Sequence, residues 1–272
     1  MSVLTELYRN RMKYVAKLAV IFLPVLIVLF VVSTEEKDKY LIGAIIVLML
    51  FLFVGTIIRD YYKMKHVSSL TIPVTTSHVM DTEKLIMKQA AWWFPRYWLF
   101  TTKGEYLGEI RLSSIPWYWH VLAIYFKKEI PRWFPFTAEL RDHEGNKLAF
   151  FTKQAGFKQT NLTFFNKEDK KMGEYIQHDL KSVMNIYGTL NDADGKEILQ
   201  SKVHGKYGDF RLVDAENKHF ATFKYGIFPL EYWKVFEDTY NPIIEMNIER
   251  TEEEKALMLL LISWWFMSVD EQ

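Results

Sequence analysis

The chain has 272 residues and a nearly balanced charge, because 34 Lys and Arg residues are matched by 33 Asp and Glu residues. Such a balance argues against broad nucleic-acid binding, which needs many side-chain cations to neutralise phosphates. The sequence contains no Cys, which excludes a disulfide framework, a thiolate nucleophile and a cysteine-based metal site. We therefore expect no nucleic-acid partner, and the lack of Cys favours a cytosolic location for the folded part.

Two strongly apolar runs lie near the N-terminus, at about residues 15–33 and 40–58. Each is close to the roughly 20 residues that a helix needs to cross the hydrocarbon core. They predict a transmembrane helical hairpin within residues 1–62. A cleaved signal peptide is the alternative for the first run, but this run has no small-residue cleavage site and contains Pro24.

Basic residues gather at the outer flanks of the two runs, whereas the connection between the runs is only STEEKDK. The flanking basic residues are Arg9, Arg11, Lys13, Lys17, Arg59, Lys63 and Lys65. Basic residues near the ends of membrane helices favour the cytoplasmic side. We therefore expect a protein that crosses the cell membrane twice, with both termini and the main domain in the cytoplasm.

Residues 63–80 are expected to form a juxtamembrane linker, and the turns around its start combine aromatic and basic side chains. Both kinds of side chain suit the headgroup layer of a membrane. The residues assigned to this anchor are Arg59, Tyr61, Tyr62, Lys63 and Lys65. Their role is either that of a simple helix-end anchor or that of a site for a particular lipid.

The rest of the chain, residues 81–272, is expected to form one mostly β domain. A unit of two alternating strands around a turn rich in Gly, Asp, Asn or Lys recurs along it, which is the pattern of a β-hairpin. The five hairpins are predicted at residues 97–110, 136–151, 161–176, 186–201 and 209–224. Their succession predicts an antiparallel sheet or barrel in which one face of each strand points to a shared core.

A helix is predicted at residues 251–269. Thr251 and Glu254 have the spacing of a capping box, and acidic residues in the first turn suit the positive end of a helix. From Ala256 to Val269 apolar residues occur on every face, so the helix must be surrounded by protein or by lipid. Because about 14 residues are too few to span a membrane comfortably, we expect a buried core helix.

The last part of the chain reads GDFRLVDAENKHFATFKYG and then EYWKVFEDTYNPIIEMNIERTEEEKALMLLLISWW. This order of a hairpin, an Asp-x-Tyr element at Asp238 and Tyr240, a strand and a terminal helix resembles the superfamily of tubby C-terminal domains, phospholipid scramblases and LURP-one-related proteins. The resemblance covers roughly residues 82–272 and implies a barrel of about twelve antiparallel strands around the central helix. The N-terminal membrane hairpin departs from the family. The sequence has no match to the basic phosphoinositide-binding motif of eukaryotic tubby domains. The resemblance therefore does not imply that this chain binds phosphoinositides.

Motifs of catalysis and metal binding are missing from the sequence. It has no P-loop and no G-x-G-x-x-G, H-E-x-x-H or G-x-S-x-G motif. His204 and His219 could approach each other across neighbouring strands, although ordinary surface positions are favoured. Asp192, Asp194 and Glu197 are similar to part of a calcium loop, but a hairpin turn of the Asp-Gly type explains them better. We therefore expect no enzyme activity, no metal and no cofactor.

An aromatic and basic insertion separates the first two hairpins. Residues 115–136 read IPWYWHVLAIYFKKEIPRWFPF, which is too aromatic for an ordinary surface loop. The segment is expected either to contact lipid at the membrane interface or to form a long core-facing strand pair. The residues expected to contact lipid are Trp117, Trp119, Phe126, Lys127, Lys128, Arg132, Trp133 and Phe134.

Two classes of function fit these features. The favoured one is a membrane-anchored, non-enzymatic domain that binds lipid or a protein partner at the inner membrane face, where tethering raises its effective concentration. The alternative is scramblase-like lipid transfer, but two spans without charged residues provide no polar path unless the protein oligomerises. A membrane-tethered enzyme of unknown reaction is a further alternative.

Overall fold

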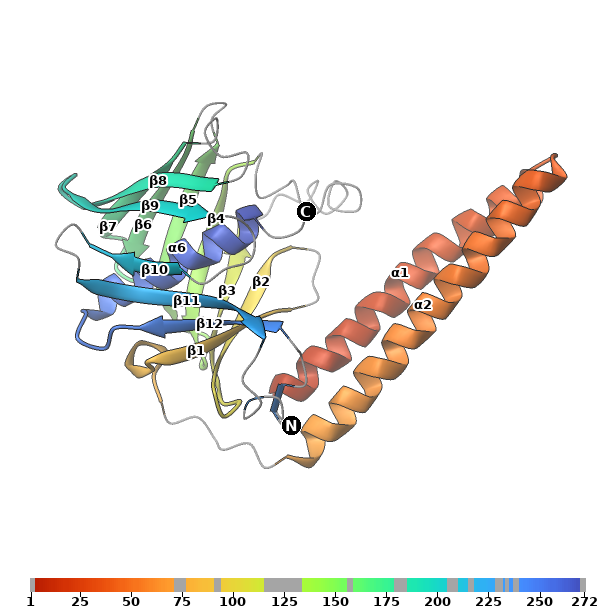
Figure 1. Cartoon of the computed structure of the whole chain (residues 1–272), viewed down its shortest axis with the longest axis horizontal. Helices are drawn as coiled ribbons and strands as arrows, with labels where there is room; N and C mark the ends of the chain where they lie inside the picture. Colours follow the sequence, from red (N-terminus) through yellow and green to blue (C-terminus); the bar gives the residue numbers. More distant parts are fainter. Residues whose placement is uncertain are drawn as a thin grey trace. The chain divides into compact units, whose positions relative to one another are not determined.

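The computed structural model describes residues 3–70, 77–90, 94–114, 134–155, 159–178, 185–204, 210–214, 218–227, 232, 235–236 and 240–269 (Figure 1). The chain divides into two compact units. The first is helical and consists of residues 1–72 with 90–92, and the second is built of strands and consists of residues 73–89 with 93–272. Each unit is described by itself below.

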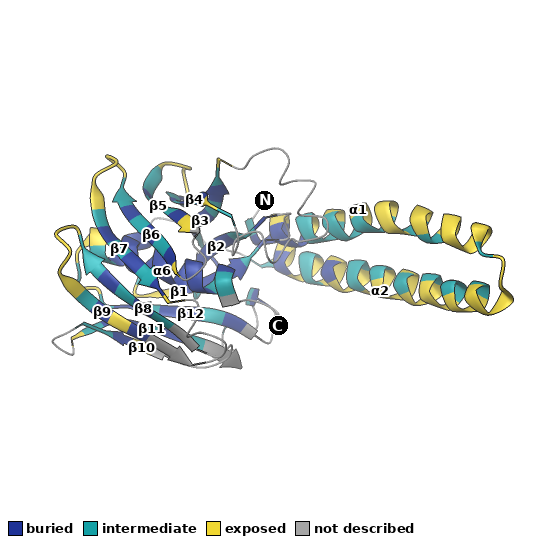
Figure 2. Ribbon diagram, turned by 90° about the horizontal axis from the view of Figure 1, so that it is seen from above, coloured by how far each residue is buried: buried dark blue, intermediate teal, exposed yellow. Residues whose placement is uncertain are grey.

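The helical unit is a hairpin of α1 (Val3–Val32) and α2 (Glu36–Ser69). Each helix contains an 18-residue stretch with a mean hydropathy of 3.0, none of which is buried, so the apolar surface faces outward (Figure 2). Both helices are therefore long and apolar enough to cross a membrane.

The helices are longer than the apolar runs that predicted them. At 1.5 Å per residue, α1 is about 45 Å long and α2 about 51 Å, whereas the hydrocarbon core is about 30 Å thick. Residues 3–14 and 59–69 contain neither Gly nor Pro, so nothing in them breaks the helix where the apolar run stops. The apolar run thus marks the part suited to lipid, and the helix continues beyond it.

Twelve antiparallel strands form a single sheet that curls into a nearly closed barrel (Figure 1). Their order is β10-β11-β12-β1-β2-β3-β4-β5-β6-β7-β8-β9. Within the described residues no ladder joins β9 to β10, and this line is called the seam below. The strands are β1 (Lys84–Gln89), β2 (Arg96–Thr101), β3 (Tyr106–Ser113), β4 (Phe136–Asp142), β5 (Lys147–Ala155), β6 (Thr160–Asn166), β7 (Lys171–Gln177), β8 (Asn185–Asp192), β9 (Glu197–His204), β10 (Phe210–Val213), β11 (His219–Ile227) and β12 (Tyr240–Met246), preceded by the short helix η1 (Val79–Asp81).

The five predicted hairpins are confirmed, and they share one turn. In each turn a residue at the end of the first strand donates its backbone N–H to the carbonyl oxygen four residues later, and its side-chain oxygen accepts the N–H of that same later residue. These residues are Thr101, Asp142, Asn166, Asp192 and Asp214. Asp, Asn and Thr side chains stabilise turns by such bonds to their own backbone.

The fourth position of the turn requires a left-handed backbone. In the four turns where it is described, φ lies between 63° and 92°. The residues are Gly104, Gly145, Asp169 and Gly195. Gly adopts this conformation without steric cost, so the Asp-x-x-Gly pattern encodes the turn directly. A register shift occurs beside each of the five turns, as expected when one extra residue is inserted into a strand pair.

The predicted core helix is α6 (Glu252–Val269), and it lies inside the barrel (Figure 1). Its capping box is formed, because the N–H of Glu254 donates to Thr251 Oγ1 at 3.3 Å and the N–H of Thr251 donates to Glu254 Oε2 at 2.9 Å. Every residue from Ala256 to Trp265 is at most 4% exposed. A fully buried Leu or Met side chain contributes about 1.5–3 kcal/mol, so this helix is a main source of the barrel's stability.

Polar groups inside the barrel are paired with one another. Trp264 Nε1 donates to Gln177 Oε1 at 2.8 Å, and Trp265 Nε1 donates to the Tyr175 hydroxyl at 3.3 Å. That hydroxyl also lies 2.7 Å from Ser201 Oγ. A Cβ at Gly188 would lie 2.2 Å from the same hydroxyl, so only Gly leaves room for Tyr175. The two Trp bonds fix the rotation of α6 against β7, and the Tyr175–Ser201 bond joins β7 to β9, since a buried unpaired polar group is costly.

Replacing Leu260 by Ala should destabilise the barrel by about 2–5 kcal/mol, because the side chain is fully buried on α6 and its removal leaves a cavity. Urea unfolding of the full-length protein, followed by Trp fluorescence, measures this change. Lys167→Ala, in an exposed turn, is the matched control and should change stability by less than about 0.5 kcal/mol. A Leu260→Ala variant as stable as this control would contradict the position of α6 inside the barrel.

Candidate functional site

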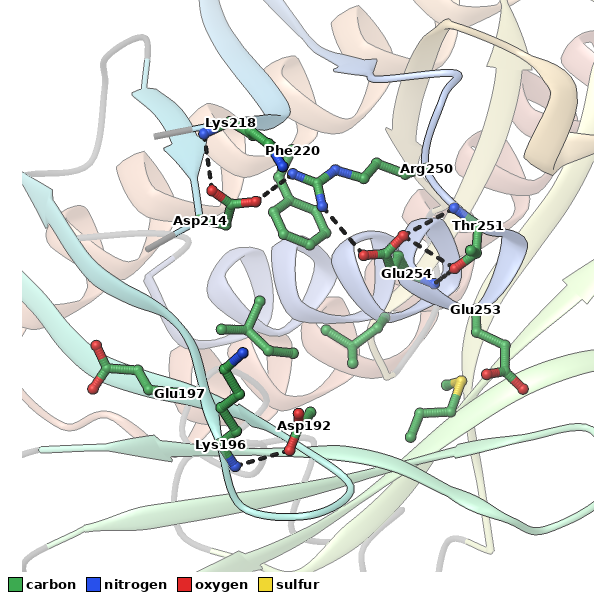
Figure 3. Close-up of a pocket in the computed structure, with 13 residues that line it drawn as sticks. Asp192, Lys196, Glu197, Asp214, Lys218, Phe220, Arg250, Thr251, Glu253 and Glu254 are labelled. Carbon is green, nitrogen blue, oxygen red and sulfur yellow. Dashed lines mark hydrogen bonds and ion pairs between the residues drawn. The ribbon is translucent and has the colours of Figure 1, made fainter. Parts of the chain in front are cut away.

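A pocket of about 410 Å³ lies between strand ends on the two sides of the seam and the N-terminus of α6 (Figure 3). Its apolar lining comes from Met172, Ile198 and Leu257, together with the ring of Phe220. Charged side chains form the rest of the lining. They are Asp192, Lys196, Glu197, Asp214, Lys218, Arg250, Glu253 and Glu254. The pocket therefore combines a small apolar surface with a charged rim.

Arg250 links the β10 side of this pocket to the N-terminus of α6. Its guanidinium donates to Asp214 Oδ2 at 2.6 Å and to Glu254 Oε1 at 3.3 Å, and its Cζ lies 4.0 Å from the centroid of the Phe220 ring (Figure 3). Burial opposes the charged form, but the hydrogen bond with Asp214 and the negative charge of Glu254 outweigh it and raise the pKa of Arg250. The ion pairs tie the end of β10 to the first turn of α6.

The other carboxylates of the pocket are held by neighbouring groups. Asp192 Oδ1 accepts the backbone N–H groups of Asp194 and Lys196, which is the shared hairpin turn. Glu197 accepts from Gln200 at 3.1 Å, and Glu253 accepts from Asn166 at 3.0 Å. The interpretation of residues 192–197 as an Asp-Gly turn is thus confirmed. Across the described ranges, no group of three His, Asp or Glu residues is arranged to hold a metal ion.

His219 lies in β11 beside the pocket, between Lys218 and Phe220. Its Nε2 is 2.8 Å from Thr222 Oγ1. Burial lowers the pKa of His219, and the positive charges of Arg211 and Arg250 lower it further, while Glu245 acts in the opposite direction. The side chain of His204, its suggested partner, lies outside the described residues.

The aromatic insertion lies almost entirely outside the described residues, which resume at Phe134. The predicted contacts Trp117, Trp119, Phe126, Lys127, Lys128, Arg132 and Trp133 belong to this part, as does Asp238 further along. Phe134 itself packs against the barrel core. Its carbonyl oxygen accepts from Lys153 Nζ at 3.1 Å, so the end of the insertion is attached to the barrel interior.

Lys153 is a buried cation that sequence reasoning missed. It is 1% exposed, and its ammonium lies 5.5 Å from the centroid of the Trp264 ring. The signal was present, because Lys153 follows Ala149 and Phe151 at the inward-facing positions of β5, where an apolar residue is expected.

The predicted juxtamembrane residues lie in the last three turns of α2. Tyr61 and Tyr62 are 50% and 65% exposed, and Lys65 is exposed. Arg59 Nε lies 3.4 Å from Asp60 Oδ1. Lys63 Nζ lies 5.9 Å from the centroid of the Tyr8 ring on α1, so it faces the neighbouring helix. The anchor residues therefore divide into exposed side chains and one that joins the two helices.

No family model, no curated protein and no solved structure matches this chain.

His219 makes stability depend on pH. Its pKa is lower in the folded protein than its ordinary value of 6.5, so the folded state binds this proton less tightly than the unfolded state does. The stabilisation is present above the ordinary value and is lost as the pH falls through the lowered pKa. We expect the urea concentration at the unfolding midpoint to decrease when the pH is lowered from about 7.5 to about 5.5. The His219→Gln variant should show a smaller decrease.

The control for this measurement is His143→Gln, in the exposed part of the β4–β5 turn, which should leave the pH dependence as it is in the unaltered protein. Equal pH dependence of the two variants would show that His219 is not responsible.

Proposed function

We propose that this protein is a membrane-anchored, non-enzymatic binding domain with a tubby-like barrel, which binds lipid or a protein partner at the cytoplasmic face of the membrane. The observation that carries this proposal is the outward-facing apolar surface of α1 and α2. Water-soluble monomers rarely leave contiguous apolar patches larger than a few hundred Å² exposed. A lipid bilayer is the environment in which two such helices are stable.

The filled interior of the barrel supports binding at its outside. Side chains of α6 occupy the place where other barrels hold a ligand or a channel. The remaining candidates for binding are the pocket at the seam, the basic ends of the membrane helices and, on its sequence alone, the aromatic insertion. Each of these is suited to recognise another molecule by charge and apolar contact.

The cytoplasmic orientation is supported by the distribution of charge along α1 and α2. Seven basic residues lie at the end of the hairpin that carries the N-terminus of α1 and the C-terminus of α2. The connection at the other end, residues 33–39, contains three acidic and two basic residues. Positively charged ends remain on the cytoplasmic side, which is also the side of the barrel domain.

A single introduced Cys tests the orientation without background, because the natural chain has none. In intact cells, a membrane-impermeant maleimide should label Lys37→Cys at the helix connection. It should label Glu168→Cys, in an exposed barrel turn, only after the membrane is permeabilised. The opposite pattern would place the barrel outside the cell, and labelling of both sites in intact cells would exclude the hairpin.

Trp fluorescence tests whether the barrel domain contacts lipid. All nine Trp residues follow residue 90 and none lies in α1 or α2, so quenching by brominated lipids cannot come from the two helices themselves. We expect quenching in the reconstituted full-length protein and its loss in the double variant Trp117→Ser, Trp119→Ser. Unchanged quenching in a variant with the same circular dichroism spectrum would contradict lipid contact by the insertion and favour a protein partner.

A further inference from the structure

An exposed row of basic side chains lies along α1 where the apolar run begins. Arg9, Lys13 and Lys17 are four residues apart, so they occupy neighbouring positions on one face of the helix. All three are exposed, and none forms an ion pair within the part of the chain that the structure describes. Arg59, 62% exposed on α2, adds a fourth cation that is partly balanced by Asp60. These four residues are called the basic collar.

The contact between Tyr8 and Lys63 places the collar relative to the membrane. The two helices run in opposite directions, and Tyr8 on α1 contacts Lys63 on α2. The position five residues after Tyr8 therefore lies at nearly the same height along the hairpin as the position four residues before Lys63. These positions are Lys13 and Arg59, about 6–8 Å from the contact at 1.5 Å per residue. The apolar run of α2 ends at Ile58. Lys13 and Arg59 therefore mark the boundary of the hydrocarbon core.

The other two members of the collar lie on either side of this boundary. Lys17 is about 6 Å deeper and Arg9 about 6 Å further out. A long Lys stem can cover apolar surface while its ammonium reaches back to the headgroups. The collar thus presents cations throughout the layer in which lipid phosphates lie, which is about 5–7 Å thick on each side of the core.

We propose that the basic collar is a binding site for anionic phospholipid headgroups. This inference rests on the proposed function, since it requires that α1 and α2 cross the membrane. Zwitterionic lipids carry a choline or ethanolamine that offsets the phosphate charge, whereas anionic lipids leave it uncompensated and attract nearby Lys and Arg. The opposite end of the hairpin lacks such a surplus, because Glu35, Glu36 and Asp38 balance Lys37 and Lys39. The hairpin should therefore select anionic lipid at one end only.

The test compares two double variants that remove equal charge from opposite ends of the same helices. Full-length protein in neutral detergent is titrated with phosphatidylglycerol or phosphatidylcholine, and bound lipid is counted by native mass spectrometry. We expect the unaltered protein to prefer phosphatidylglycerol, and Lys13→Gln with Lys17→Gln to weaken that preference at least about tenfold, since each cation is worth roughly fivefold near an anionic surface. Lys37→Gln with Lys39→Gln should leave it unchanged.

An unaltered protein without preference for phosphatidylglycerol would overturn the inference, as would equal loss in the two double variants. Two single variants test the assigned depths. Arg9→Gln, which removes the outermost cation, should reduce the preference for phosphatidylglycerol less than Lys13→Gln does. Equal effects of these two single variants would contradict the assigned levels. The maleimide experiment distinguishes failure of this inference from failure of the proposed function. If the expected positions are labelled but the protein shows no preference for phosphatidylglycerol, the membrane anchor is supported and only the collar site is contradicted.

Discussion

The structure of the β unit depends on the need to enclose α6. A helix that is apolar on every side cannot lie on a surface, so the sheet must surround it. Barrels of eight strands are filled by their own inward side chains, whereas a larger barrel leaves an open interior. Twelve strands provide space for a helix about 10 Å across. The apolar helix α6 therefore requires a barrel of about this size, and a barrel of this size requires a helix to fill it.

The shared hairpin turn makes a barrel of this size possible. Five successive turns use the same side-chain contact to the backbone, and the four whose fourth position is described use the same left-handed conformation there. Each adds one residue to its strand pair, which increases local twist and bends the sheet. Repeated around the sheet, this bending brings β9 and β10 near each other. Arg250 then joins β10 to α6 beside the seam by side-chain contacts.

Much of this fold could be predicted because its signals are local. Asp192 and Gly195 specify a turn within four residues, and Thr251 and Glu254 specify a helix start within one turn. The ends of α1 and α2 were placed less well, since hydropathy reports where lipid contact stops and not where hydrogen bonding stops. The pocket could not be predicted at all. Arg250 and Asp214 are 36 residues apart, and nothing in either segment indicates that the barrel will bring them together.

The position of α6 after every strand has a consequence for biosynthesis. Ribosomes add roughly 5–20 residues per second, so the strands from Lys84 to Met246 emerge over roughly 10–30 s before their core is made. The helical hairpin of α1 and α2 precedes the strands in the chain and is synthesised before them. Until α6 emerges, the inward-facing apolar side chains of the strands have no helix to pack against. The barrel can consequently complete its packing only after α6 has been translated.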